Sequence, residues 1–262
     1  MELQRQTLLR LLPELPPDRL VLLEETDSTN LYAKEIARAG APGGTVILAE
    51  RQTAGRGSAG RSFSSPEGGI YLTVLLRPAC KPEALLPLTP LLAVAAADAV
   101  ERCCGFRPGI KWVNDLVAQG RKLAGLLAET VLAPDGSVAC AAGIGVNCDG
   151  ALPPELQKIA IGLREITGKK TDRNALTAEL VRGVLLAEKA LEGDRAAWME
   201  RYRADCVTLG REVLVASPEG DYRARAERID DDGALYVTDA AGTRRRIAAG
   251  TVSVRGLYGY CE

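Results

Sequence analysis

Hydrophobic and polar positions follow two different periods over the first two hundred residues, so both strands and helices are expected there. The apolar runs at 45–49 and 70–76 are short and rich in β-branched residues, which is typical of buried strands. The stretch 84–102 is almost uniformly alanine and leucine with no polar face of any width, and it predicts a buried packing helix. Further helices are predicted at 30–39, 174–191 and 195–205, and further strands at 20–24, 110–116, 121–129 and in the apolar run that ends at 143–147.

The pattern changes from Gly210 onward. Short apolar runs are separated there by turn sequences such as Pro218-Glu219-Gly220, and this predicts a small β-barrel with strands near 212–216, 222–229, 234–238, 244–248 and 252–255. We therefore expect a larger mixed unit at 1–208, which begins with a short helical extension at 1–19, and a small β unit at 209–262.

Composition excludes several classes of function. The 262 residues include no histidine, which removes Ser-His-Asp and Cys-His catalysis and every histidine metal site. Any chemistry must therefore rely on lysine, arginine, carboxylates or a bound cation. The net charge of −1 argues against a general nucleic-acid or membrane-surface role.

Residues 1–12 carry charges within their apolar pattern and lack a cleavage site of small residues, so a secretory signal is not expected. No apolar run is long enough to span a bilayer. The seven cysteines never occur in CxxC spacing and are expected to be reduced thiols, mostly buried. These features predict a cytoplasmic protein without a membrane partner.

The stretch 52–61 combines glycines with arginines. Arg51, Arg56 and Arg61 are five residues apart, and no acidic residue lies between Arg51 and Pro66. Glycines at 55, 57 and 60 allow a close approach to a ligand, and guanidinium groups suit carboxylate and phosphate oxygens. The alternative is a flexible, solvated surface loop.

Polar residues also interrupt two apolar patterns. Ser28 and the two polar residues that follow it stand at the expected start of a helix, where one of them is needed as a cap and the others can bind a polar ligand.

Lys111 and Asp115 can form a surface ion pair. With Trp112 and Asn114 they also supply a cation for phosphate, a stacking face, an amide and a carboxylate for Mg²⁺.

The run 244–246 consists of three arginines and could indicate a nucleic-acid site. In a strand these side chains would alternate between faces, and the small unit holds about as many acidic as basic residues. A solvated face is therefore the favoured interpretation.

Five short stretches, in this order, resemble the motifs of biotin–protein ligases: Asp27-Ser28-Thr29-Asn30, Gln52-Thr53-Ala54-Gly55-Arg56-Gly57 with Gly60-Arg61, Lys111-Trp112-Val113-Asn114-Asp115, Gly120-Arg121-Lys122-Leu123-Ala124-Gly125 and Gly145-Val146-Asn147. The resemblance covers about residues 22–148. It implies an α+β fold, with a catalytic domain related to class II aminoacyl-tRNA synthetases, a central mixed sheet and flanking helices. An SH3-like β-barrel would follow.

The resemblance also implies the reaction. ATP and Mg²⁺ would activate biotin as biotinyl-adenylate, and the biotinyl group would pass to a lysine of a biotin carboxyl carrier domain. Both reactants of the first step are anionic, so cations would lower its barrier. The catalytic candidates are Arg56, Arg61 and Lys122, with Lys111 as a weaker one, and Asp115 as metal ligand and candidate general base.

Binding roles follow from the same resemblance. The biotin-binding candidates are Ser28, Thr29, Asn30, Gln52, Arg56, Gly57, Ser58, Lys122 and Gly125. The ATP-binding candidates are Arg56, Arg61, Phe63, Trp112, Asn114, Asp115 and Asn147, and the resemblance leaves open whether Phe63 or Trp112 stacks on the adenine.

The sequence departs from the family at two positions. Ser58 stands where the family commonly has arginine or another large residue, and Val113 where it often has proline. Only about twenty residues precede the motifs, too few for the winged helix-turn-helix of some members, so no DNA binding is expected. A homodimer is common among relatives, but the sequence identifies no interface.

Two alternatives remain at this point. The first is a lipoate or octanoate protein ligase of the same superfamily, and the second is a non-enzymatic biotin-sensing protein.

Overall fold

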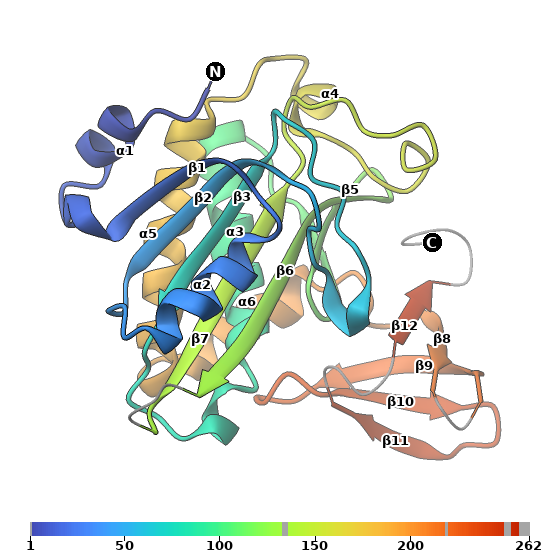
Figure 1. Cartoon of the computed structure of the whole chain (residues 1–262). Coiled ribbons are helices and arrows are strands. Elements are labelled where there is room, and N and C mark those ends of the chain that lie inside the picture. The colour runs from blue at the N-terminus through green and yellow to red at the C-terminus, as the bar shows by residue number, and fades with distance from the viewer. Residues whose placement is uncertain (1, 133–135, 218–219, 249–252, 257–262) are drawn as a thin grey trace.

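The computed structural model of the chain describes residues 2–132, 136–217, 220–248 and 253–256. Within these ranges, one sheet has seven strands in the order β1-β2-β3-β7-β6-β5-β4, and a second has five in the order β11-β10-β9-β8-β12 (Figure 1). The neighbouring strands β1 and β2 run parallel, and the other pairs of both sheets are antiparallel. The predicted mixed α+β fold, followed by a small β unit, is confirmed.

The first sheet is built around strands buried on both faces. All seven residues of β3 are buried, which explains its unbroken apolar run. The strands in spatial order are β1 (Leu20–Thr26), β2 (Thr45–Gln52), β3 (Ile70–Leu76), β7 (Val138–Val146), β6 (Arg121–Leu132), β5 (Asp115–Ala118) and β4 (Gly109–Lys111).

Helices cover both faces of this sheet. Helix α2 (Thr29–Arg38) lies in front of it in Figure 1, and α3 (Leu88–Cys104), α5 (Arg173–Glu192) and α6 (Arg195–Asp205) lie behind it. The packing helix begins at Leu88 rather than at 84, because residues 82–85 form the short 3-10 helix η3 and Pro87 occupies the cap position. The remaining short helices are α1 (Arg5–Leu11), η1 (Pro17–Arg19), η2 (Ser58–Gly60) and α4 (Leu163–Thr167).

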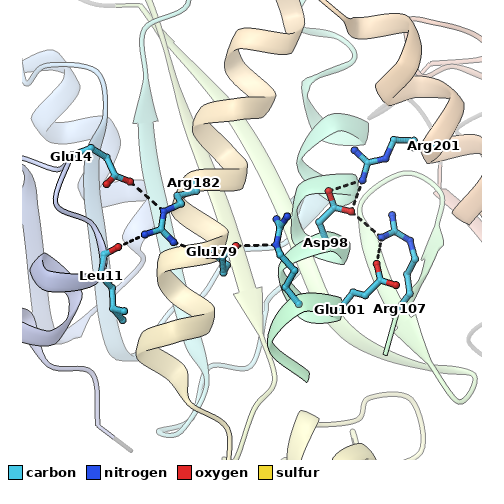
Figure 2. Close-up of polar contacts among 9 residues, drawn as sticks. Leu11, Glu14, Asp98, Glu101, Arg107, Glu179, Arg182 and Arg201 are labelled. Atoms are coloured by element: carbon cyan, nitrogen blue, oxygen red, sulfur yellow. Dashed lines mark hydrogen bonds and ion pairs between the residues drawn. The ribbon is translucent and has the colours of Figure 1, made fainter. Parts of the chain in front are cut away.

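Ion pairs link the helices behind the sheet to one another and to the N-terminal segment (Figure 2). Arg182 on α5 lies 3.4 Å from Glu14 and also donates to the carbonyl of Leu11. Asp98 on α3 contacts Arg107 at 2.9 Å and is also paired with Arg201 on α6. The first residues of the chain are therefore packed onto the larger unit.

The second sheet contains β8 (Glu212–Ala216), β9 (Tyr222–Ile229), β10 (Leu235–Asp239), β11 (Arg244–Ile247) and β12 (Ser253–Gly256). The three arginines of β11 are exposed, and each has an acidic neighbour: Glu227 at 3.9 Å, Asp239 at 3.7 Å and Asp230 at 2.8 Å. Their charges are therefore balanced locally.

The described residues include six of the seven cysteines and the helices named above. The cysteines there are all free, and Cys140, Cys148 and Cys206 are buried; Cys261 lies outside the described ranges. None of the described helices has both the length and the apolar character needed to cross a membrane.

Candidate active site

The N-terminus of α2 directs hydroxyl and amide groups toward the middle of the sheet. Ser28 is the N-cap residue and is 1% exposed, yet its side chain makes no capping hydrogen bond. The Asp27 carboxylate instead accepts from the backbone N–H of Ser28. The Ser28 hydroxyl borders a pocket and is available to a ligand.

Thr29 and Asn30 are held by a buried polar network. The side-chain oxygen of Gln52 accepts from the Thr29 backbone N–H at 2.8 Å and from its hydroxyl at 3.1 Å. The Thr73 hydroxyl lies 2.8 Å from Thr29 Oγ1 and 2.7 Å from Asn30 Oδ1. Thr73 is fully buried on β3, and sequence reasoning missed its role.

Two glycines on β7 make room for site side chains. A Cβ atom at Gly143 would lie 2.2 Å from Asn30 Oδ1, and one at Gly145 would lie 2.6 Å from the Phe63 ring. Real Cβ atoms do not approach other atoms so closely. The two glycines therefore allow Asn30 and the Phe63 ring to lie directly against the backbone of β7.

A polar cleft opens between the N-terminus of α2 and strands β3, β6 and β7. Its walls combine apolar side chains with the amide and hydroxyl groups described above. It is lined by Ser28, Thr29, Asn30, Gln52, Arg56, Gly57, Phe63, Tyr71, Leu72, Asn114, Lys122, Gly125, Leu126, Leu127, Gly143, Ile144 and Gly145. We call it the polar pocket.

A second cleft adjoins it, and we call this one the outer pocket. The two pockets share Gly57, Phe63 and Lys122. The outer pocket is also lined by Ser58, Arg61, Ser62, Ser64, Asp115, Asn147, Leu152, Leu156, Ile159 and Ala160.

The apolar wall of the outer pocket comes from a segment without a recognisable motif. Lys122 holds this segment in place, because its backbone N–H donates to Ile159 at 2.8 Å and its carbonyl accepts from Ile161 at 2.9 Å. Leu152, Leu156 and Ile159 were missed by sequence reasoning, since residues 150–160 have neither a clear apolar period nor a cluster of polar groups.

Lys122 stands at the boundary of the two pockets. Its Nζ atom lies 2.6 Å from Asp115 Oδ1 and 5.5 Å from the centre of the Phe63 ring. A Cβ atom at Gly125 would lie 3.0 Å from that Nζ, so the glycine leaves space for the lysine side chain. The Lys122 side chain is about one quarter exposed, and the residue lines both pockets.

In the stretch 52–61, the side chains of Arg56 and Arg61 take different positions. The Arg61 guanidinium is folded back onto Ser58, with Nη2 3.1 Å from Oγ and Nε 3.2 Å from the carbonyl. Arg56 lines the polar pocket, and its Nη2 atom lies 3.4 Å from Glu129 Oε1. Both arginines therefore border the pockets.

Glu129 is a further residue that sequence reasoning missed. Burial disfavours its charged form, but hydrogen bonds from Asn30 and Lys34, together with the charges of Lys34 and Arg56, hold the pKa of the Glu129 carboxyl below its usual value. The carboxylate thereby fixes the Asn30 amide, at 3.0 Å, and receives Arg56. Only its position opposite α2 in the fold indicates this role.

Comparison with known proteins identifies this arrangement. Residues 22–149 match the model of the biotin/lipoate A/B protein ligase family, and residues 208–255 match the biotin protein ligase C-terminal domain. A curated relative named biotin–[acetyl-CoA-carboxylase] ligase, from Paracoccus denitrificans, is 33% identical over 248 residues, which are 90% of this chain and 100% of that protein. The chain belongs to the biotin–protein ligase family.

Two further relatives agree with this assignment. The bifunctional ligase/repressor BirA of Bacillus subtilis is 31% identical over 249 residues, covering 90% of this chain and 74% of that protein. The solved structure of biotin protein ligase from Aquifex aeolicus in complex with biotin and ATP has a TM-score of 0.77 and 28% identity, and the match covers 90% of this chain and 98% of that one. The resemblance inferred from the motifs is thus confirmed.

Most of the residues expected to form the biotin–protein ligase site border one of the two pockets. Lys111 and Trp112 line neither of them. Trp112 is 6% exposed, and its indole N–H donates to the Gly233 carbonyl in the smaller sheet at 2.9 Å. Of the two aromatic residues considered for adenine stacking, Phe63 borders both pockets and Trp112 is buried away from them.

Because the chain has no histidine, a metal ion would have to be held mainly by carboxylate or thiol side chains. No group of three or more aspartate, glutamate or cysteine side chains gathers as a metal site within the described ranges. Asp115 is the carboxylate of the outer pocket lining. A single carboxylate fits Mg²⁺ that is held mainly by the phosphates of a nucleotide.

Proposed function

We propose that this chain is an ATP-dependent biotin–protein ligase that activates biotin as biotinyl-adenylate and transfers it to a lysine of a biotin carboxyl carrier domain. The observation that carries the proposal is the pair of adjoining pockets with Lys122 between them. A reaction that joins a carboxylate to a nucleotide phosphate needs two neighbouring binding sites and a cation where they meet. The match of residues 208–255 to the biotin protein ligase C-terminal domain favours biotin over lipoate or octanoate.

Biotin fits the polar pocket by its chemistry. Its ureido ring offers N–H donors and a carbonyl acceptor, which we assign to Ser28, Thr29, Asn30 and Gln52. The hydrocarbon part of the ligand would lie against apolar walls such as Leu126 and Ile144. Its carboxylate would then point toward Lys122 and Arg56.

ATP fits the outer pocket. The leucine side chains and the Phe63 ring supply apolar contact for the adenine, and the Ser58–Arg61 turn lies beside the phosphates in this assignment. Asn147 donates to the Lys122 carbonyl at 3.3 Å and presents its amide oxygen to the nucleotide. Asn114 donates to Leu126 at 2.9 Å, so its main role in this proposal is to hold the pocket wall.

In the first step, a carboxylate oxygen of biotin bonds to the α-phosphorus of ATP and the bond to the β-phosphate oxygen breaks, releasing pyrophosphate. Lys122, Arg56 and Arg61 offset the negative charge that gathers at this point. Mg²⁺ supplies further charge neutralisation on the phosphates, and Asp115 is the residue that we assign to it. Asp115 also positions Lys122 through their 2.6 Å contact.

In the second step, the neutral ε-amine of the acceptor lysine attacks the carbonyl of the adenylate. The bond to AMP breaks, an amide bond to biotin forms, and the amine nitrogen loses one proton, for which Asp115 is the candidate base. The Lys122 side chain is 24% exposed, and in this proposal a carrier domain brings its lysine to that point. The family relationship supports a carrier domain of acetyl-CoA carboxylase or a related biotin-dependent enzyme as the partner.

The remaining assignments are part of this proposal. The catalytic domain spans 1–208 and the C-terminal domain 209–262, which is supported by the two separate sheets. The chain acts in the cytoplasm, and it does not bind DNA, which is supported by its balanced charge and by the paired arginines of β11. A homodimer would be tested by its mass in solution.

One assay tests the function. The chain is incubated with a purified biotin carboxyl carrier domain, biotin, ATP and Mg²⁺, and the intact mass of the acceptor is measured. We expect a gain of one biotinyl group, and none when the acceptor lysine is replaced by arginine or when lipoate replaces biotin. No mass change in the complete reaction would refute the ligase function. Binding of biotin without transfer would favour a biotin sensor.

A further inference from the structure

The segment with the sequence Lys-Trp-Val-Asn-Asp is held in place by the C-terminal part of the chain. It forms the turn between β4 and β5, at the edge of the large sheet. The backbone N–H of Val207 donates to the Ile110 carbonyl at 2.9 Å. The backbone N–H of Trp112 donates to the Thr208 hydroxyl, also at 2.9 Å. The Tyr202 hydroxyl donates to the Val113 carbonyl at 3.1 Å.

The indole of Trp112 extends this attachment to the smaller sheet. Its N–H donates to Gly233, 121 positions along the chain, and the contact is buried. A buried indole N–H needs such a partner, because leaving it unpaired is costly. Gly233 belongs to the β9–β10 turn, the end of the smaller sheet that reaches the larger unit (Figure 1).

The β9–β10 turn has hydrogen bonds of its own besides the one from the indole. The Asp230 carboxylate accepts from the N–H groups of Asp232, at 3.1 Å, and Ala234, at 2.9 Å, and it pairs with Arg246 at 2.8 Å. Gly233 has a φ of +83°, and a Cβ atom there would lie 2.8 Å from Pro90 on α3. The turn is therefore preformed and seated directly on the catalytic unit.

The same sheet contains a second turn of the same construction. The Asp239 carboxylate accepts from Ala241, at 3.0 Å, and Thr243, at 2.9 Å, and it lies 3.7 Å from Arg245. Gly242 takes a φ of +80°, like Gly233, but a Cβ atom there would meet nothing within 4 Å. The two turns are built alike but differ in their contacts with the larger unit, since the β9–β10 turn meets Trp112 and is also bonded to Arg203 of α6 through the Ile229 carbonyl and Asp231.

We propose that Trp112 is a positioning residue for adenylation, through which the β9–β10 turn fixes Asp115 beside Lys122. The inference rests on the proposed function. Asn114 has its own anchors, since its amide donates to Leu126 at 2.9 Å and its carbonyl accepts from the Leu126 N–H at 2.8 Å. Loosening Trp112 should therefore spare the biotin pocket and disturb the ATP-dependent step.

Three variants of the full chain test this inference. Trp112→Phe keeps the ring and removes the N–H, Asp230→Ala loosens the docked turn, and Asp239→Ala loosens the matched undocked turn. Pyrophosphate release is measured with biotin and increasing ATP, and biotin affinity is measured without ATP by calorimetry. Active enzyme is counted by biotin titration, so that a loss of folded protein is not read as a loss of rate.

We expect Trp112→Phe and Asp230→Ala to lower kcat/KM for ATP by about 10- to 100-fold, the effect of a small misplacement at a reacting centre. Their biotin Kd should stay within about twofold of wild type, as should both parameters of Asp239→Ala. The double variant Trp112→Phe with Asp230→Ala should lose no more than the worse single variant, because both changes break one connection.

Equal losses in Asp230→Ala and Asp239→Ala would overturn the inference, and so would a Trp112→Phe enzyme with the wild-type kcat/KM for ATP. A biotin Kd that weakens in parallel with the rate would also overturn it. If Trp112→Phe does not fold, the two aspartate variants decide the question. Absence of biotin-dependent pyrophosphate release in the wild type would instead refute the proposed function itself.

Discussion

Replacing Lys122 by alanine removes the cation at the boundary of the polar and outer pockets. Its Nζ atom borders both cavities and is oriented by Asp115 at 2.6 Å, so the group is already in place before substrates bind. A preorganised charge of this kind contributes most where negative charge gathers during the reaction. We therefore expect the variant to be impaired in the formation of biotinyl-adenylate.

The size of the effect can be estimated in two ways. Removing one preorganised group typically costs about 100- to 1,000-fold in rate, or about 2.7–4 kcal/mol. Two unit charges about 4 Å apart interact by about 4 kcal/mol at an effective dielectric constant of about 20, which suits a site near the surface. Lys122 is 24% exposed, so the value should lie toward the lower end of this range.

The assay is single-turnover release of pyrophosphate at saturating biotin and ATP, with active sites counted by biotin binding. Lys158→Ala is the matched control, because it removes an exposed lysine from the segment that walls the outer pocket without touching the lining. We expect Lys158→Ala to remain within about twofold of wild type. A Lys122→Ala enzyme that releases pyrophosphate within about threefold of the wild-type rate would refute the assignment.

Three further predictions follow from single contacts. Ser58→Arg should slow the release of biotinyl-adenylate by about 5- to 30-fold, measured by stopped flow, because a long cationic side chain can add one charge-assisted hydrogen bond; equal off-rates would show that other residues hold the loop. The chain should give no salt-resistant, sequence-selective gel shift with operator-like DNA, because the arginines of β11 are paired with acidic groups. Glu129→Gln should lower the free energy of unfolding by about 1 kcal/mol at neutral pH. Because the pKa of Glu129 is lowered from 4.5 in the folded chain, its ionised form stabilises the fold above about pH 4.5, and the gap to wild type in urea titrations should narrow as the pH falls further; a gap that stays constant or widens with falling pH would contradict this reasoning.

Much of the fold could be predicted because its elements bury most of their own surface. Strand β3 and helix α3 are apolar on nearly every side, so their sequences carry a strong signal. The starts of α2 and α5 were also close to expectation, since caps and glycines mark helix ends. The order of the strands in the sheet was not predictable from local sequence patterns. Strand β7, for example, pairs with β3, which is distant in sequence, as well as with β6.

The site could be predicted where a function requires a rare local combination of residues. Arginines among glycines, or a lysine before Leu-Ala-Gly, stand out from an ordinary loop or strand. Thr73 and Glu129 do not, because a threonine or a glutamate within a strand is common. Their roles depend on facing Asn30 from β3 and β6, which only the assembled sheet determines.

Trp112 is the opposite case: its sequence context suggests contact with a ligand, but the structure buries its side chain away from both pockets. A tryptophan between a lysine and an asparagine suggests a ring offered to a ligand, and adenine stacking was one of two interpretations. The indole has one polar atom, however, and its burial requires an acceptor that need not lie nearby in the sequence. That acceptor is the carbonyl of Gly233, in a turn whose Asp-x-x-Gly pattern occurs twice in the same small sheet. Neither copy is distinguishable by sequence, because the difference between them lies in contact with Pro90 and Trp112. Sequence therefore predicts the chemistry of the segment at Asn114 and Asp115, whereas its contacts with the C-terminal part of the chain are seen only in the folded arrangement.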